Sequence, residues 1–295
     1  MIKLVGLGLS LDTLTIRDIV ELTQCDIVYI DSYTSLWFPS VGVLEEILLS
    51  VGLDVRIAKR RDLEGEGIDR VIEESKSKCV CIAVPGDPMV ATTHVAIAVE
   101  AAKRGVETVV VPSMSILNAI ASATCLQVYR FGKVVTVVKP KNGVFYEYPM
   151  RVLAENRERN LHTPLLLEID VEKGYYMNPR EAFEILLEAQ KRMGLDILRE
   201  NDVVIILKDV GSANGRIEVT ELREVLEKRY ENGLYTLIVP AKKLHPIEEE
   251  CLEELSRGRK LCLGIGTGEQ YTELYRDLVK RIVKMARSAF NLRAS

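Results

Sequence analysis

The stretch Cys79–His94, CVCIAVPGDPMVATTH, contains the main elements of the predicted fold in one place. Its first part, Cys79–Val84, is an unbroken apolar run of the length of a β-strand, and a turn rich in proline and glycine follows before a helix opens at Thr93. Strands that are apolar on both faces and alternate with helices are typical of parallel sheets covered on both sides. The stretch therefore predicts an α/β fold.

The residues around this stretch repeat the same alternation. Thr15 with Asp18 three residues later has the pattern of a helix N-cap, and the polar segment 60–67 is expected to be a loop. Together these patterns predict a mainly parallel sheet in an N-terminal domain. Its strands are expected over 2–6, 26–31, 54–59, 79–84 and 107–111, with helices over 15–25, 43–50, 68–76 and 93–103.

The rest of the chain changes character after Pro112. Several strands follow one another closely there, so we expect a mixed sheet, and Asn178-Pro179 supplies the start of a helix. Strands are expected over 134–138, 164–169, 203–207, 217–219 and 235–239, and helices over 148–157, 180–192 and 220–230. We divide the chain into an N-terminal α/β domain over 1–112, a C-terminal α/β domain over 113–260 and a helical extension over 261–295, whose periodic part is 269–291.

Composition narrows the class of protein. The chain has 295 residues with 47% hydrophobic and 28% charged residues, which describes a globular protein. Its formal net charge is −4, with positive charges scattered through both halves, which argues against a nucleic-acid partner. No signal segment or membrane span is expected, so we place the protein in the cytoplasm. The six cysteines and three histidines lack the spacing of a metal site, so no metal is expected and the cysteines are interpreted as buried free thiols.

Two short loops carry candidate ligand positions. Gly6-Leu7-Gly8 follows the first strand, where α/β sheets bind ligands, but position 11 is Leu where a dinucleotide-binding fingerprint requires glycine. Asp31 ends the second strand, where a nicotinamide enzyme would hold a ribose. No GxxxxGK[ST], HExxH or GxSxG pattern is present, which disfavours the common NTPases, zinc proteases and serine hydrolases.

The PGDP turn at 85–88 has two interpretations. Gly86 suits a positive φ angle or the close approach of a ligand, and Asp87 stands at the carboxyl end of the predicted sheet. The alternative is a capped turn in which Asp87 serves structure alone. These residues alone are compatible with both interpretations. His94 and His245 likewise fit either helix-start residues or functional groups.

Five motifs in a fixed order resemble those of the diphthine synthases, a family of S-adenosylmethionine-dependent methyltransferases. They are GLGL at 6–9, YIDSYTS at 29–35, PGDPMVATTH at 85–94, PSMSI at 112–116 and LHTPLLLEID at 161–170, and the resemblance covers roughly residues 1–250. It implies a two-domain tetrapyrrole-methylase-like fold with the cofactor in the interdomain cleft, and a homodimer. It also implies the acceptor: the amino group of a 3-amino-3-carboxypropyl arm on a histidine of translation elongation factor 2, methylated successively to give diphthine in diphthamide biosynthesis.

Candidate site residues fall into two groups, one for the acceptor and one for the cofactor. Tyr33, Thr34 and Ser35 lie near the end of the second predicted strand and would face the acceptor arm, or else form a hydroxyl-rich loop that solvates itself. The chain departs from the family where Lys208-Asp209-Val210-Gly211-Ser212 replaces Ala-Arg-Ala-Gly-Ser, which reverses a charge, and where only Asp12 of an acidic pattern remains. The resemblance implies cofactor contacts at Leu9, Asp87, Val90, Ser115, Ile116, Leu167, Val210 and His245.

Methyl transfer from a sulfonium donor is an in-line displacement that requires alignment of the acceptor lone pair and exclusion of water. It needs no nucleophilic side chain, only a neutral amine at the moment of attack, so we assign no catalytic residue. Rival hypotheses on the same fold are a tetrapyrrole C-methyltransferase of the precorrin or uroporphyrinogen type and a ribosomal RNA ribose methyltransferase. Rivals of another class are a non-catalytic adenosyl-ligand sensor and a nicotinamide oxidoreductase.

Overall fold

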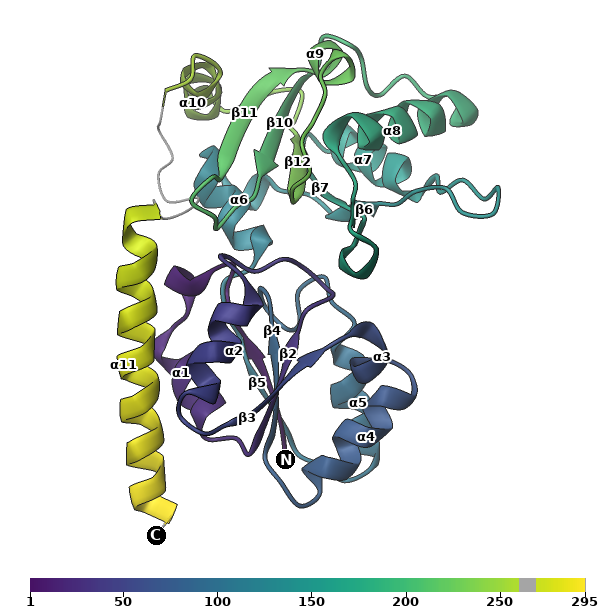
Figure 1. Cartoon of the computed structure of the whole chain (residues 1–295). Helices are drawn as coiled ribbons and strands as arrows, with labels where there is room; N and C mark the ends of the chain where they lie inside the picture. Colours follow the sequence, from purple (N-terminus) through teal and green to yellow (C-terminus); the bar gives the residue numbers. More distant parts are fainter. Residues whose placement is uncertain (260–268, 295) are drawn as a thin grey trace.

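Two five-stranded sheets with helices on both faces make up most of the molecule (Figure 1). The computed structural model describes residues 1–259 and 269–294. The first sheet has the strand order β3-β2-β4-β1-β5 and all its strands are parallel, as predicted. These strands are β1 (Ile2–Gly6), β2 (Ile27–Asp31), β3 (Asp54–Ala58), β4 (Val80–Val84) and β5 (Thr108–Val111).

Alternate residues of the first sheet enter two separate apolar clusters. On β2, Val28 and Ile30 pack with helices on one face, whereas Ile27 and Tyr29 pack with helices on the other. This two-sided burial explains why the central strands are mostly apolar, with Lys3 and Asp31 as their charged residues. The first face is covered by α1 (Ile16–Thr23) and α2 (Val41–Leu49), and the second by α4 (Glu66–Ser75) and α5 (Val95–Lys103).

Local signals predicted some boundaries and missed others. Thr15 caps α1 as expected, because its side chain accepts a hydrogen bond from the amide of Asp18 and the Asp18 carboxylate accepts one from the amide of Thr15. The prediction of a loop over 60–67 is wrong: Arg60–Leu63 forms the short helix α3, and α4 already begins at Glu66. Helix α3 is one turn long, too short for a hydrophobic period to reveal it.

The second sheet has the order β11-β10-β12-β7-β6 and is mixed, as predicted, because only β6 and β7 pair in parallel. Asn178 caps α8, and Pro179 occupies its first position. The strands are β6 (Val135–Val137), β7 (Thr163–Leu167), β10 (Val203–Lys208), β11 (Arg216–Glu221) and β12 (Tyr235–Val239), beside a small hairpin of β8 (Ile169–Asp170) and β9 (Tyr175–Tyr176). Helices α7 (Tyr148–Glu158), α8 (Pro179–Met193) and α9 (Leu222–Glu227) pack on one face, and α6 (Ile116–Thr124) and α10 (Pro246–Ser256) on the other.

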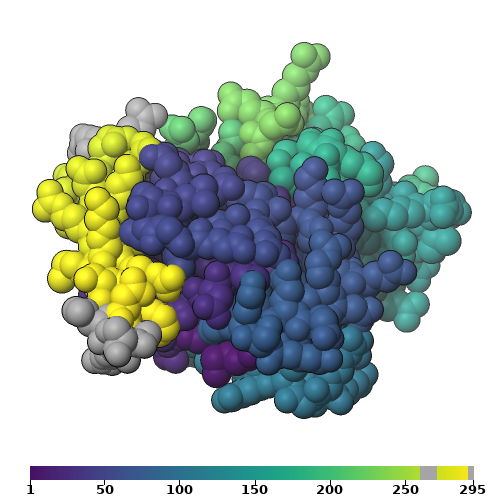
Figure 2. Space-filling model, turned by 60° about the horizontal axis from the view of Figure 1, so that its bottom comes forward, coloured from purple at the N-terminus to yellow at the C-terminus, as the bar shows by residue number. Residues whose placement is uncertain are grey.

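The C-terminal helix α11 (Glu269–Ala294) packs along the first domain rather than the second (Figures 1 and 2). Val279 and Val283 are buried in the same apolar cluster as residues of α1 and α2. Arg276 pairs with Glu46 at 2.5 Å, and Arg287 donates a hydrogen bond to the carbonyl oxygen of Thr23. The helix therefore closes one face of the first domain.

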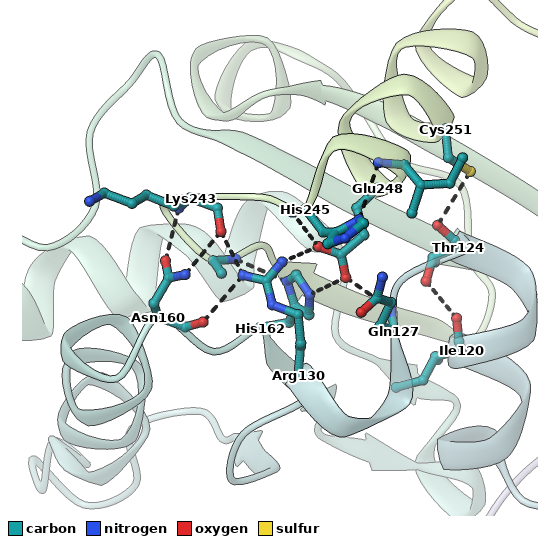
Figure 3. Close-up of polar contacts among 12 residues, drawn as sticks. Ile120, Thr124, Gln127, Arg130, Asn160, His162, Lys243, His245, Glu248 and Cys251 are labelled. Carbon is teal, nitrogen blue, oxygen red and sulfur yellow. Dashed lines mark hydrogen bonds and ion pairs between the residues drawn. The ribbon is translucent and has the colours of Figure 1, made fainter.

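A buried polar cluster joins the start of α10 to the second sheet (Figure 3). Glu248 is fully buried, and its carboxylate accepts hydrogen bonds from the amides of Gln127 and His245 at 3.0 and 2.9 Å and pairs with Arg130. His162, also fully buried, lies with Nε2 3.1 Å from the same carboxylate. We term these five residues the Glu248 cluster.

The hydrogen bond to the other ring nitrogen of His162 determines the tautomer of its imidazole. The amide of Ala241 donates to His162 Nδ1 at 3.0 Å, so the ring proton resides on Nε2 and is donated to Glu248. Burial lowers the pKa of His162 against the opposing influence of Glu248. Burial raises the pKa of Glu248, but the amides of Gln127 and His245, with His162, outweigh it and hold that pKa below its ordinary value. The cluster is thus a neutral imidazole beside a carboxylate.

Cysteine pairing differs from the prediction at one position. Cys25, Cys79, Cys81 and Cys251 are free thiols, as expected. Cys125 is disulfide-bonded, so the interpretation of free thiols is wrong there. Cys262 lies outside the described residues.

The packing of α11 predicts that Val283→Asp lowers the free energy of unfolding by about 3 kcal/mol or more, because the substitution places an unpaired charge in an apolar contact. Met285→Asp is the matched control, since Met285 is 72% exposed on the same helix and should lose no more than about 1 kcal/mol. Chemical denaturation measures both variants. Equal losses would show that α11 contributes no packing.

The Glu248 cluster predicts that Glu248→Leu costs about 3–5 kcal/mol at pH 7, because it leaves Arg130 and His162 without their partner. Glu250→Leu, an exposed position on the same helix, should change stability by no more than about 0.5 kcal/mol. Since the folded pKa of Glu248 is lowered, its contribution is present above about pH 4.3 and is lost as pH falls through the folded pKa. A difference in stability between wild type and Glu248→Leu that stays constant below about pH 4.3 would contradict this account.

Candidate functional site

A cavity of about 340 Å³ lies between the two domains, within the ~300–1,000 Å³ range of small-molecule sites. The carboxyl ends of β1, β2 and β4 meet at one edge of the first sheet, and the chain leaves β1 and β4 in opposite directions across it. Loops after these strands form one wall, and the second sheet forms the other. The lining comprises Leu9, 34–36, Phe38, 85–87, 90–92, 115–116, Thr136, Val138, 166–169, Val210 and 234–236.

The glycines of the first wall allow its loops to approach each other. Gly86 has φ +80°, and a Cβ atom there would meet no protein atom within 4 Å, so its backbone is open on that side. The amide of Gly86 donates to the carbonyl oxygen of Gly8 at 2.7 Å, which joins the loops after β4 and β1. A Cβ atom on Gly6 would lie 2.5 Å from Cβ of Ser113, so only glycine fits that contact.

Asp87 organises the loop that it lies in. Its Oδ1 accepts a hydrogen bond from the amide of Met89 at 2.8 Å, and its Oδ2 accepts one from the amide of Ser113 at 3.0 Å. Ser113 lies just beyond β5, on the chain that leads into the second domain. Asp87 therefore has a structural role, and it also lines the cavity, so the two interpretations of the PGDP turn are not exclusive.

Apolar residues from both domains meet across the cavity. Leu9 packs in the same cluster as Ile116 and Val210, and Leu167 contributes from β7. Val90 and Ser115 also line the cavity. Seven of the eight positions expected to contact the cofactor thus converge on one cavity, although they are spread over about two hundred residues of sequence.

His245 is the one expected cofactor position that the structure does not bring to the cavity. It caps α10, where its Nδ1 accepts a hydrogen bond from the amide of Ile247, and its backbone amide joins the Glu248 cluster (Figure 3). His245 therefore matches the helix-start interpretation, and a cofactor contact there stays a prediction.

The Tyr33–Ser35 turn divides between the cavity and the core. Thr34 and Ser35 line the cavity, whereas Tyr33 is 1% exposed, with Arg60 over its ring at 4.9 Å. Burial, with the nearby carboxylates of Asp31 and Glu64, raises the pKa of the Tyr33 hydroxyl. Tyr33 therefore supports the turn from behind.

Asp209, at the position where the family resemblance implies an arginine, also has a structural role. It adopts φ +49°, and its Oδ1 accepts a hydrogen bond from the amide of Leu234 at 2.7 Å. The side chain fixes the turn before β12 and is not among the residues that line the cavity, whereas its neighbour Val210 is. The charge reversal therefore does not place a carboxylate in the cavity.

Several lining residues had no signal in the sequence. Thr136, Val138 and Tyr235 reach the cavity only because β6, β7 and β12 are neighbours in the second sheet. Burial, with the charges of Asp209 and Glu231, raises the pKa of Tyr235 to about 12, so its hydroxyl stays protonated. Glu168 also lines the cavity, but its carboxylate is held by the amide of Lys139.

Within residues 1–259 and 269–294, no group of three or more His, Cys, Asp and Glu side chains is arranged to hold a metal ion. No helix in that part of the chain combines the length and apolar character that crossing a membrane requires.

Comparisons with known proteins agree with this geometry. The model of a family described as Tetrapyrrole (Corrin/Porphyrin) Methylases matches residues 1–226. The diphthine synthase of Staphylothermus marinus is 38% identical over 250 residues, which cover 84% of this chain and 91% of that protein. The diphthine synthase of Methanocaldococcus jannaschii is 33% identical over 259 residues, which cover 86% of this chain and 98% of that protein.

Solved structures give the same result. The crystal structure of a diphthine synthase superposes with a TM-score of 0.75 at 33% identity and covers 87% of this chain and 96% of its own. A conserved hypothetical protein from Aeropyrum pernix K1 superposes with a TM-score of 0.75 at 30% identity. The match covers 97% of this chain and 98% of that protein, and it therefore extends into α11. The chain therefore belongs to the tetrapyrrole methylase family and, within it, to the diphthine synthases, which makes it a methyltransferase.

Proposed function

We propose that this methyltransferase uses S-adenosylmethionine to methylate, in successive steps, the amino group of a 3-amino-3-carboxypropyl arm on a histidine of translation elongation factor 2, giving diphthine. The observation that carries the proposal is the convergence of Leu9, Asp87, Val90, Ser115, Ile116, Leu167 and Val210 on one interdomain cavity, beside Thr34 and Ser35. The family resemblance further leads us to propose a cytoplasmic homodimer.

The cavity fits an adenosyl donor in size and in chemistry. Apolar side chains from both domains offer contacts for a flat ring and a thioether, Ser115 offers a polar contact, and the absence of a side chain at Gly86 leaves room for close approach. The donor supplies a methyl group already activated on a sulfonium. We propose that Leu9, Val90, Ile116, Leu167 and Val210 hold it, with Asp87 fixing the loop that carries Val90.

The residues of this chain then have three tasks. The apolar lining excludes water, Thr34 and Ser35 orient the acceptor arm, and the two walls hold the amine in line with the bond that breaks. The Tyr235 hydroxyl stays protonated, and the two oxygens of the Glu168 carboxylate are held by the Lys139 amide and the Lys141 ammonium, so we assign neither residue as a base. We propose that the amine loses its proton to water before it reaches the cavity and that desolvation keeps it neutral.

Mass spectrometry of elongation factor 2 tests the acceptor. The factor carrying the unmethylated arm is incubated with the enzyme and S-adenosylmethionine, and we expect mass gains of whole methyl groups confined to the modified histidine. Elongation factor 2 whose histidine has not been modified is the control and should gain nothing. No gain, with donor binding confirmed by calorimetry, would move the acceptor to a tetrapyrrole or to RNA.

The contacts of Asp87 predict that Asp87→Ala weakens binding of S-adenosylhomocysteine by about tenfold or more, because the loop loses two hydrogen bonds to a charged group. Asp69→Ala, at an exposed carboxylate on α4, should bind as the wild type does. Isothermal calorimetry measures both. Unchanged affinity in a folded Asp87→Ala protein would reduce Asp87 to a turn residue.

A further inference from the structure

A second buried pair lies directly behind the Tyr33–Ser35 turn. Asp31, at the end of β2, is fully buried, and its carboxylate accepts hydrogen bonds from the amides of Tyr33 and Thr34 at 2.9 and 3.1 Å and from the Thr34 hydroxyl at 2.5 Å. One carboxylate therefore sets the backbone of the turn and the orientation of its hydroxyl.

His94 approaches the same carboxylate from the other loop. It ends the segment 85–94 and is 1% exposed, with Nε2 3.4 Å from Asp31 Oδ2. Neither ring nitrogen of His94 has a hydrogen-bond partner in the structure. An unpartnered buried imidazole is costly, and a residue serving packing alone would be apolar.

The surroundings of His94 favour a neutral ring. Burial lowers its pKa, and the carboxylates of Asp31 and Glu64 oppose that effect. Glu64 itself is engaged by Arg60 and by the Thr93 hydroxyl, so Asp31 is the carboxylate that lies within reach of His94. A neutral imidazole can donate its one N–H to Asp31 Oδ2 after a small movement, without withdrawing the carboxylate from the turn.

The two loops that this contact would join form different parts of the cavity wall. Strands β2 and β4 are neighbours in the sheet, so the loops that follow them leave side by side. The loop after β2 presents Thr34 and Ser35, and the loop after β4 presents Asp87, Val90 and Thr92. Under the proposed function, the first loop orients the acceptor and the second holds the donor.

We infer that Asp31 and His94 are positioning residues that couple the acceptor-side turn to the donor-side loop, so that the amine and the methyl donor are aligned. This role rests on the proposed function for the assignment of the two sides. Neither residue lines the cavity, so both act through Thr34 and its neighbours and not by touching substrate.

Two substitutions at His94 separate hydrogen bonding from packing. His94→Gln keeps an N–H that can reach Asp31, whereas His94→Met keeps the bulk without a donor. We expect kcat/KM for the acceptor protein to be about tenfold lower in His94→Met than in His94→Gln. We also expect the Kd for S-adenosylhomocysteine to agree within about twofold between them. Equal kcat/KM in the two variants, or a parallel loss of donor affinity, would overturn the inference.

Amide hydrogen exchange gives a readout that does not depend on the acceptor. The amides of Tyr33 and Thr34 donate hydrogen bonds to Asp31, and a donor at position 94 would hold that carboxylate in place. These amides should therefore exchange about tenfold faster in His94→Met than in His94→Gln. If wild-type enzyme fails to methylate elongation factor 2, the proposed function fails while this exchange result still decides whether the pair exists. Equal exchange rates would refute the pair.

Variants of Asp31 provide a second test if His94→Met does not fold. Asp31→Asn keeps an oxygen that can accept hydrogen bonds from the turn amides and from His94, and Asp31→Leu removes it at similar volume. Asp31 does not line the cavity, so acceptor kcat/KM about tenfold lower in Asp31→Leu than in Asp31→Asn, at equal donor affinity, would support the coupling. Equal values would contradict it.

Discussion

The carboxylate of Asp87 carries the interaction on which the cleft depends. It holds its own turn through the amide of Met89 and holds the start of the interdomain connection through the amide of Ser113. Ser113 in turn packs closely against Gly6, and its hydroxyl donates to Asp18, which closes the first turn of α1. The exits of β1, β4 and β5 are therefore fixed relative to one another by a few short contacts, and the first wall of the cavity follows from them.

The second wall is built differently, because residues within strands contribute to it beside residues of the adjoining turns. Leu167 and Tyr235 project from β7 and β12, so their positions follow from the register of the mixed sheet. The Glu248 cluster lies on the far part of this domain and ties α10 to the sheet through buried charges (Figure 3). A polar cluster of this kind is costly unless every member is satisfied, and in Glu248 both carboxylate oxygens have partners.

Much of this arrangement could be predicted from local pattern. The largely apolar runs of β1, β2 and β4 identified the parallel sheet because burial on both faces favours apolar residues at successive positions of a strand. Seven of the eight positions taken from the motifs line one cavity, and those of the first domain, Leu9, Asp87 and Val90, follow strands whose carboxyl ends parallel pairing brings together. Thr136 and Tyr235 could not be predicted, since they reach the cavity only through strand order in the second sheet.

Other features could not be predicted because they depend on contacts between residues far apart in the chain or on elements too short to show a pattern. The sequence suggests that Asp209 reverses a charge in a binding pocket, but its carboxylate accepts a hydrogen bond from the amide of Leu234. The one-turn helix α3 has no period to detect, and Cys125 gives no sign in the sequence that it is disulfide-bonded. These outcomes depend on tertiary contacts that spacing along the chain does not encode.

A crystal structure of the complex with S-adenosylhomocysteine would test the central claim most directly. The account predicts that the ligand lies between the domains, with its adenosyl and thioether groups against Val90, Ile116 and Leu167 and near the open backbone at Gly86. Ligand bound outside this cavity, or contacts confined to one domain, would contradict the assignment of the interdomain cavity as the donor site.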